Sequence, residues 1–117
     1  MNKKPKKTFD VLGSPWELYT GTVEEYPLLD EMDGYTDHSA KCIVVREKTD
    51  DCQVLNFEWC QNKIIRHEII HAYLYESGLD GCMDLVKGIG GHPEQLVDWI
   101  AIQFPKIMKT YQELNVI

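Results

Sequence analysis

The chain has 117 residues, of which 19 are acidic and 12 are Lys or Arg, so its formal net charge is -7. This length suits one domain with a single core, and the 44% hydrophobic content is typical of a soluble globular protein. No apolar run is long enough for a transmembrane helix, and no apolar segment follows the basic start as it would in a signal peptide. We therefore expect a cytoplasmic protein with no membrane partner.

Positive charge is concentrated at the N-terminus, where Lys3, Lys4, Lys6 and Lys7 supply four of the twelve basic residues. The remainder has eight basic residues against 19 acidic ones, a charge of -11. An acidic body is a poor partner for nucleic acid, so no nucleic-acid binding is expected. We predict a disordered basic tail over residues 1–8 and one domain over residues 9–117.

The first half of the domain is predicted to form a small β-sheet. An apolar segment, Thr8–Leu12, ends at a Gly-Ser-Pro turn, and Trp16–Thr20 alternates as a half-buried strand does. Residues 24–34 are acidic and turn-rich, with no clear regular element. Residues 35–38 then lead into a strand at Lys41–Arg46, where β-branched residues cluster.

Two helices are predicted in the second half. The first runs from about Val54 to Ser77, with Asp51 or Asn56 as its N-cap and Gly78 as its C-terminal stop. A glycine-rich loop over residues 81–91 follows. The second helix begins at Pro93, and Pro105 is expected to kink or break it. The predicted fold class is therefore α+β.

The first helix contains the pattern HExxH, formed by His67, Glu68 and His71. On an α-helix these three side chains share an arc of about 100°. Most other positions around them are apolar, so the helix is expected to be largely buried, which would leave the polar groups in need of partners. One Zn²⁺ ion would satisfy them, with His67 and His71 as ligands and Glu68 as the base that takes a proton from metal-activated water. The competing interpretation is a chance match on a helix with two core histidines.

A catalytic zinc site commonly has three protein ligands, so the two histidines need a partner. Glu94 and Asp98 stand four residues apart at the start of the second helix. We assign Glu94 as the third ligand and Asp98 as the hydrogen-bond acceptor that orients a ligand histidine. His92 and Asp98 compete with Glu94 for the third position, and either acid could instead favour a helix N-terminus through its dipole.

These motifs resemble the gluzincin branch of the zincin metallopeptidases, in which HExxH is followed by a helix opening with ExxxD. The sequence segments at residues 66–72 and 94–101 resemble those of compact zincins of phages and mobile elements, such as the ImmA/IrrE group. They are more distantly similar to those of SprT-like proteins. The resemblance covers about residues 35–104. It implies a minimal zincin domain, in which a small N-terminal sheet packs on the HExxH helix.

The expected function is zinc-dependent hydrolysis of peptide bonds, acting on an intracellular protein substrate such as a regulator of a phage or mobile element. The substrate is expected to pair with the edge of the strand formed by Lys41, Cys42, Ile43, Val44, Val45 and Arg46. Tyr73, Tyr75 and His38 are candidates for stabilising the oxyanion. The alternative function is a zinc-stabilised protein-binding module without turnover, in which Cys82 or His92 completes the metal's coordination.

Overall fold

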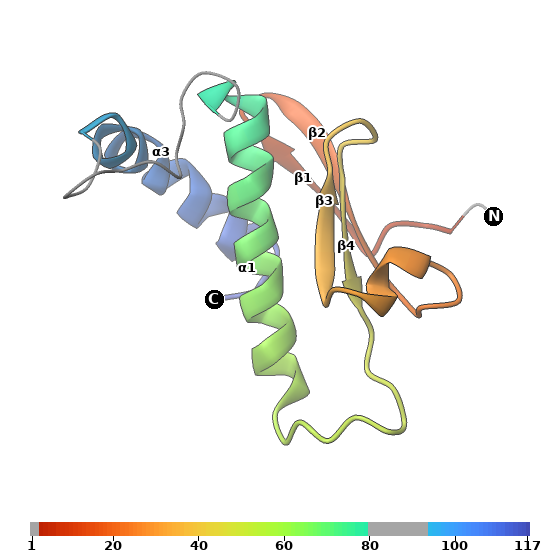
Figure 1. The fold of residues 1–117 in the computed structure, drawn as a ribbon. Coiled ribbons are helices and arrows are strands. Elements are labelled where there is room, and N and C mark those ends of the chain that lie inside the picture. The colour runs from red at the N-terminus through yellow and green to blue at the C-terminus, as the bar shows by residue number, and fades with distance from the viewer. Residues whose placement is uncertain (1–2, 80–93) are drawn as a thin grey trace.

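In the computed structural model, the chain forms a four-stranded mixed sheet with α-helices packed on one face (Figure 1). The structure describes residues 3–79 and 94–117; the side chains of residues 94, 95, 97, 98 and 101 also lie outside this description. The elements are β1 (Lys7–Val11), β2 (Ser14–Gly21), the 3-10 helix η1 (Pro27–Asp30), β3 (Gly34–Asp37), β4 (Cys42–Arg46), α1 (Phe57–Glu76) and α3 (Glu94–Glu113). The predicted α+β class is confirmed.

The strands lie in the order β1-β2-β4-β3. β1 and β2 form an antiparallel hairpin, whose turn at Leu12 and Gly13 has φ values of 52° and 94°. β2 pairs in parallel with β4, and β3 pairs antiparallel with β4. β4 therefore lies inside the sheet, while β1 and β3 form its two edges.

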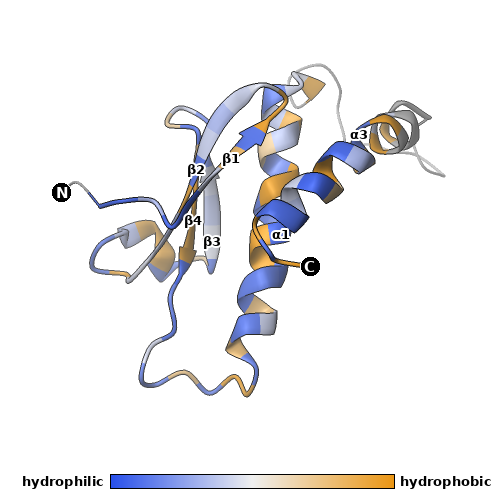
Figure 2. Cartoon of the chain, turned by 180° about the vertical axis from the view of Figure 1, so that it is seen from behind, coloured by the Kyte–Doolittle hydropathy of each residue, from blue (hydrophilic) through white to orange (hydrophobic). Residues whose placement is uncertain are grey.

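The core lies between α1 and the inner face of the sheet. Alternate residues of each strand point toward the helix, as expected for a sheet with one face covered. On the sheet side, the most deeply buried residues are Val11, Trp16, Leu18, Ile43 and Val45. Ile65, Ile69, Ala72 and Tyr73 contribute from α1, all at 2% exposure or less. In Figure 2 this layer shows as hydrophobic colour along the side of α1 that faces the strands.

The long helix is close to the predicted one. Asn56 is its N-cap, and the Asn56 side-chain oxygen accepts a hydrogen bond from the Trp59 amide at 3.0 Å. Just beyond its C-terminal end, Gly78 has a φ of 78°, a conformation that glycine adopts at little cost. Both predicted boundary signals are thus confirmed, although the helix begins at Phe57 instead of Val54.

α3 crosses behind α1 in Figure 1 and packs on it through its C-terminal half. Ile107, Tyr111 and Leu114 are buried there, and the Tyr111 hydroxyl donates to the Arg66 carbonyl at 3.2 Å. The helix continues past Pro105, so of the two predicted outcomes, a kink or a break, the break is wrong. Neither α1 nor α3 is long and apolar enough to cross a membrane, among the residues that the structure describes.

The N-terminal boundary of the domain lies earlier than predicted. Lys7 and Thr8, assigned to the tail, belong to β1, where they pair with Leu18 and Glu17. The Lys3 ammonium also contacts the Thr20 carbonyl and Glu25. Lysine is uncommon in strand interiors, but an edge strand such as β1 leaves its charged group in water.

Gly34 allows β3 to lie close against α1. A Cβ atom at this position would lie 2.8 Å from Ile64 Cγ2 and 3.0 Å from Val45 Cγ1. We expect Gly34→Ala to lower the free energy of unfolding by about 1–3 kcal/mol, because the helix and strand must separate to admit the methyl group. Urea denaturation measures this change. Introducing Ile64→Ala first should reduce the cost of Gly34→Ala; an undiminished cost would show that Ile64 is not the obstructing neighbour.

Candidate metal centre

The two histidines of HExxH lie side by side on α1. Their Nε2 atoms are 3.2 Å apart, and their ring centroids are separated by 4.9 Å. The one-turn spacing in the helix brings the rings together, as expected for residues i and i+4. With neutral rings, one Nε2 can donate a hydrogen to the other; alternatively, both nitrogens can face one cation.

The measured separation fits a shared zinc ion. Zinc binds imidazole nitrogen at about 2.0–2.1 Å in tetrahedral geometry, which places two ligand nitrogens about 3.3 Å apart. The 3.2 Å separation of the His67 and His71 Nε2 atoms is close to this value. However, both histidine side chains are exposed to solvent. The prediction that they are buried, and therefore require a metal or another partner, is wrong. α1 turns its apolar side to the sheet and leaves this pair toward solvent.

Glu68 differs from its histidine neighbours because it is buried, with 7% of its surface exposed. Its Oε1 atom accepts a hydrogen bond of 2.8 Å from the hydroxyl of Thr36 on β3. The same hydroxyl lies 3.1 Å from the Glu68 carbonyl oxygen. The edge strand therefore fixes the position of this carboxylate. Thr36 was not identified from the sequence, because nothing in a single chain indicates which strand residue will face the helix.

The remaining predicted ligands cannot be placed. Glu94 is the first residue of α3 and Asp98 lies one turn later, but both side chains lie outside the described residues. His92 and Cys82 also lie outside them. Within residues 3–79 and the described part of α3, no three His, Cys, Asp or Glu side chains converge as a metal-binding group. The third ligand thus stays a prediction.

The prediction that the strand at Lys41–Arg46 forms an edge of the sheet is wrong. β4, at Cys42–Arg46, has hydrogen-bonded neighbours on both sides, so it has no free edge at which a substrate could pair. Among the described residues, β3, from Gly34 to Asp37, pairs on one side only and also contacts α1; the sequence predicts this segment only as the approach to the strand at Lys41–Arg46. Its four residues include a glycine and an aspartate, two types that are depleted in strands, which explains why the pattern was missed.

Of the three oxyanion candidates, Tyr73 is excluded by its position. It is 2% exposed, and its hydroxyl lies 2.7 Å from the Thr110 hydroxyl and 3.1 Å from the Lys106 carbonyl. Tyr75 lies one turn beyond His71 and stacks on His38, with ring centroids 4.8 Å apart. His38 and Tyr75 are therefore the two candidates on the side of α1 that carries the histidine pair.

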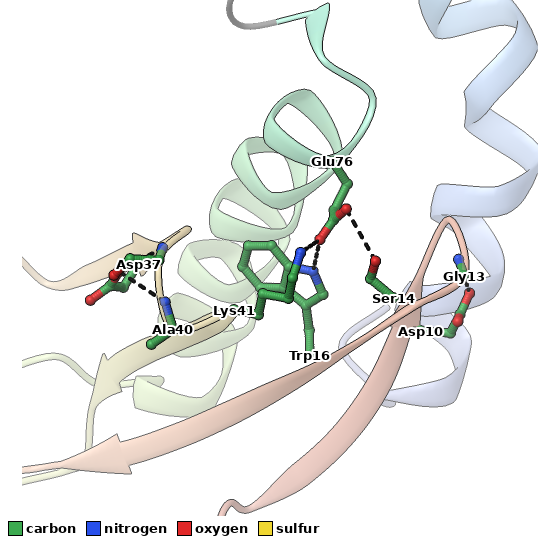
Figure 3. A network of polar contacts seen from close by, with 9 residues as sticks. Asp10, Gly13, Ser14, Trp16, Asp37, Ala40, Lys41 and Glu76 are labelled. Carbon is green, nitrogen blue, oxygen red and sulfur yellow. Dashed lines mark hydrogen bonds and ion pairs between the residues drawn. The ribbon is translucent and has the colours of Figure 1, made fainter.

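A polar network holds the end of α1 to the start of β2 and to Lys41, which directly precedes β4 (Figure 3). The Glu76 carboxylate accepts hydrogen bonds from Trp16 Nε1 at 2.9 Å and from the Ser14 hydroxyl at 3.2 Å, and it forms an ion pair with Lys41. The Lys41 ammonium, together with the Trp16 and Ser14 donors, holds the pKa of Glu76 below its ordinary value. The same network places Trp16 in a stack with His38.

Comparison of the chain with protein-family models, curated proteins and solved structures found no match. The case for any function therefore depends on the residues and their geometry.

The Thr36 hydroxyl should be important for the stability of the buried carboxylate. We expect Thr36→Val to lower the free energy of unfolding by about 1–3 kcal/mol, because Glu68 would lose its donor while staying out of water. Thr36→Ser is the matched control, since it keeps the hydroxyl. Urea denaturation of both variants at neutral pH provides the comparison, and equal stability would show that the hydrogen bond contributes nothing.

The hydrogen bonds and ion pair of Glu76 should make the free energy of unfolding depend on pH. A carboxylate whose pKa is lowered by folding stabilises the protein above its unfolded-state pKa, near the ordinary value of 4.5. That contribution is lost as the pH falls through the lower folded-state pKa. Denaturation midpoints measured between about pH 3 and pH 7 should thus fall less steeply with acid in Glu76→Gln than in the original chain.

The control for this measurement is Glu31→Gln, which neutralises an exposed carboxylate. It should follow the pH dependence of the original chain. If Glu76→Gln does the same, the ion pair and hydrogen bonds at Glu76 contribute no pH-dependent stability.

Proposed function

We propose that this protein binds one Zn²⁺ ion through His67 and His71 and hydrolyses peptide bonds with Glu68 as general base. The observation that carries the proposal is the 3.2 Å separation of the two Nε2 atoms, next in sequence to a buried carboxylate held by the sheet. A pair of core histidines matched by chance would be buried and bonded to other elements. His67 and His71 are exposed instead, and the Nε2 atom of each ring lies beside that of the other.

Each residue has a defined task in this proposal. The imidazoles of His67 and His71 would hold the metal, with Glu94 as the proposed third ligand and Asp98 as the acceptor that would orient one ring. The bound zinc would lower the pKa of a water molecule and polarise the scissile carbonyl. The proposed minimal zincin domain would consist of the sheet, α1 and α3.

Glu68 would take a proton from the attacking water and return it to the leaving amine. Its Oε1 atom is bonded to the Thr36 hydroxyl, and among the described residues no hydrogen bond reaches the other carboxylate oxygen. One oxygen is thus anchored, and the second has capacity to accept the proton. Thr36 acts as a positioning residue, because a base must be held within hydrogen-bond distance of the proton it accepts.

The proposed substrate is an extended protein segment that pairs with the free edge of β3. Main-chain hydrogen bonds to a sheet edge bind extended peptides with little dependence on sequence. Thr36 lies on this strand and contacts Glu68, so a segment paired there would pass close to the base. An intracellular protein, such as a regulator of a phage or mobile element, is the substrate that the family resemblance suggests.

Metal binding and catalysis can be tested separately. Zinc affinity should fall by about 100-fold or more in His71→Ala, since even outer-sphere partners of a ligand contribute 10–100-fold. Competition with a chromophoric chelator measures this affinity. Glu68→Gln should retain zinc but lose about 10²–10⁴-fold in hydrolysis of a labelled unfolded protein, because the amide cannot accept the proton.

His38→Ala is the control for the affinity measurement, since it removes an exposed imidazole outside the pair. It should bind zinc as the original chain does.

If zinc binds tightly with no hydrolysis in any preparation, the chain is a zinc-stabilised binding module. Cobalt substitution would then reveal a thiolate band if Cys82 completes the coordination. Unchanged zinc affinity in His71→Ala would refute the metal centre itself.

A further inference from the structure

The outer face of the sheet, opposite α1, carries a hollow of about 350 Å³. In Figure 1 the N-terminal segment and η1 lie on this side of the strands, and the helices lie on the other. The residues that line the hollow are Lys3, Tyr19, Tyr26, Tyr35, Asp37, Cys42 and Val44. Most of these are aromatic or ionisable, so the hollow offers both flat ring faces and charged groups to a ligand.

Strand register arranges the hollow in two rows. In the first row, Val44 lies between Tyr19 of β2 and Tyr35 of β3, each directly opposite it in the pairing. Val44 is only 2% exposed on this face, on which the N-terminal segment and η1 also lie (Figure 1). The two tyrosines are half-buried, and burial raises the pKa of each. This row forms an apolar channel with an aromatic ring on either side.

The second row is acidic. Cys42 lies directly between Glu17 of β2 and Asp37 of β3. Burial, followed by the charges of Asp37 and Glu17, raises the pKa of the Cys42 thiol, so this position is neutral between two carboxylates. The Asp37 Oδ1 atom accepts hydrogen bonds from the Ser39 hydroxyl at 2.5 Å and the Ser39 amide at 3.0 Å. These bonds lower the pKa of Asp37 and keep it ionised.

One ammonium group of the chain already contacts the rim of this hollow. The Lys3 ammonium lies 5.7 Å from the centre of the Tyr26 ring and forms an ion pair with Glu25 at 3.1 Å. Tyr26 in turn lies 6.4 Å from Tyr19, centroid to centroid. The contact shows the chemistry that the surface favours, in which a cation lies over a tyrosine face beside a carboxylate.

We propose that the hollow binds the lysine side chain of a partner peptide. Its apolar stem would lie between the rings of Tyr19 and Tyr35, and its ammonium would lie over Cys42 beside Asp37, with Glu17 adding negative charge from the neighbouring position on β2. Residues two apart on a strand are separated by about 6.6 Å, which matches the length of a lysine side chain. The proposal is independent of the metal centre, which lies on the opposite side of the sheet.

Two observations favour an alkylammonium over other ligands. Within the described residues, which include Glu17, Cys42 and Asp37, no three His, Cys, Asp or Glu side chains converge as a metal-binding group. The net charge of -7 repels anions and nucleic acid. A cation with an apolar stem satisfies both rows together, because the aromatic channel and the carboxylates are adjacent.

The test is a titration of the full chain with the tripeptide acetyl-Gly-Lys-Gly-amide, followed by backbone amide shifts in ¹H–¹⁵N spectra. We expect shifts confined to β2, β3 and β4, and no such shifts with the same peptide carrying ε-acetyllysine. Asp37→Asn should weaken binding about three- to tenfold, since exposed ion pairs and cation–π contacts are individually modest. Its amide oxygen can still accept the Ser39 hydrogen bonds, so the turn should be preserved.

Tyr19→Leu should also weaken binding, whereas Tyr19→Phe should keep it, because the ring and not the hydroxyl is required. Asp50→Asn is the charge-matched control and should bind as the original chain does. Three outcomes would overturn the proposal. They are shifts spread over the whole acidic surface, equal binding by Asp37→Asn and Asp50→Asn, and tighter binding of an arginine peptide than of the lysine peptide.

Discussion

The packing of α1 on the inner face of the sheet is the interaction on which the rest of the structure depends. Ile65, Ile69 and Ala72 lie on one side of the helix and are at most 2% exposed. Each larger side chain contributes about 1.5–3 kcal/mol when it is fully buried. Because these residues fix the rotation of the helix about its axis, they also decide where its polar residues point. His67 and His71 face outward, and Glu68 faces the edge strand.

The close approach of β3 to α1 allows a strand residue to hold the Glu68 carboxylate of the candidate metal centre. A glycine at position 34 removes the side chain that would separate strand and helix. Thr36, two residues later, can then bond the carboxylate of Glu68. An exposed glutamate on an isolated helix would sample many rotamers, whereas this one is held by a strand far from it in sequence. Among the described residues this strand pairs on one side only, so in the proposed function substrate pairing and positioning of the base would depend on one element.

The two faces of the sheet differ because strand residues alternate in direction. Ile43 and Val45 face the helix and join the core, while Cys42 and Val44 face outward between tyrosines and acids. Each face therefore has its own chemistry: an apolar layer that packs on the helix carrying HExxH, and an aromatic and acidic hollow proposed to bind a cation. The Glu76 network ties the end of α1 to the start of β2 and to Lys41, just before β4.

The sequence by itself determined the elements whose signals are local. Asn56 and Gly78 delimit α1 through capping and positive φ, and the HExxH spacing alone places two imidazoles one turn apart. The α+β class followed from the order of these patterns. Only the tertiary structure decided which strand forms the edge, since pairing partners are chosen by contacts between distant segments. It also decided that the histidines are exposed, because burial depends on which side of the helix meets the sheet.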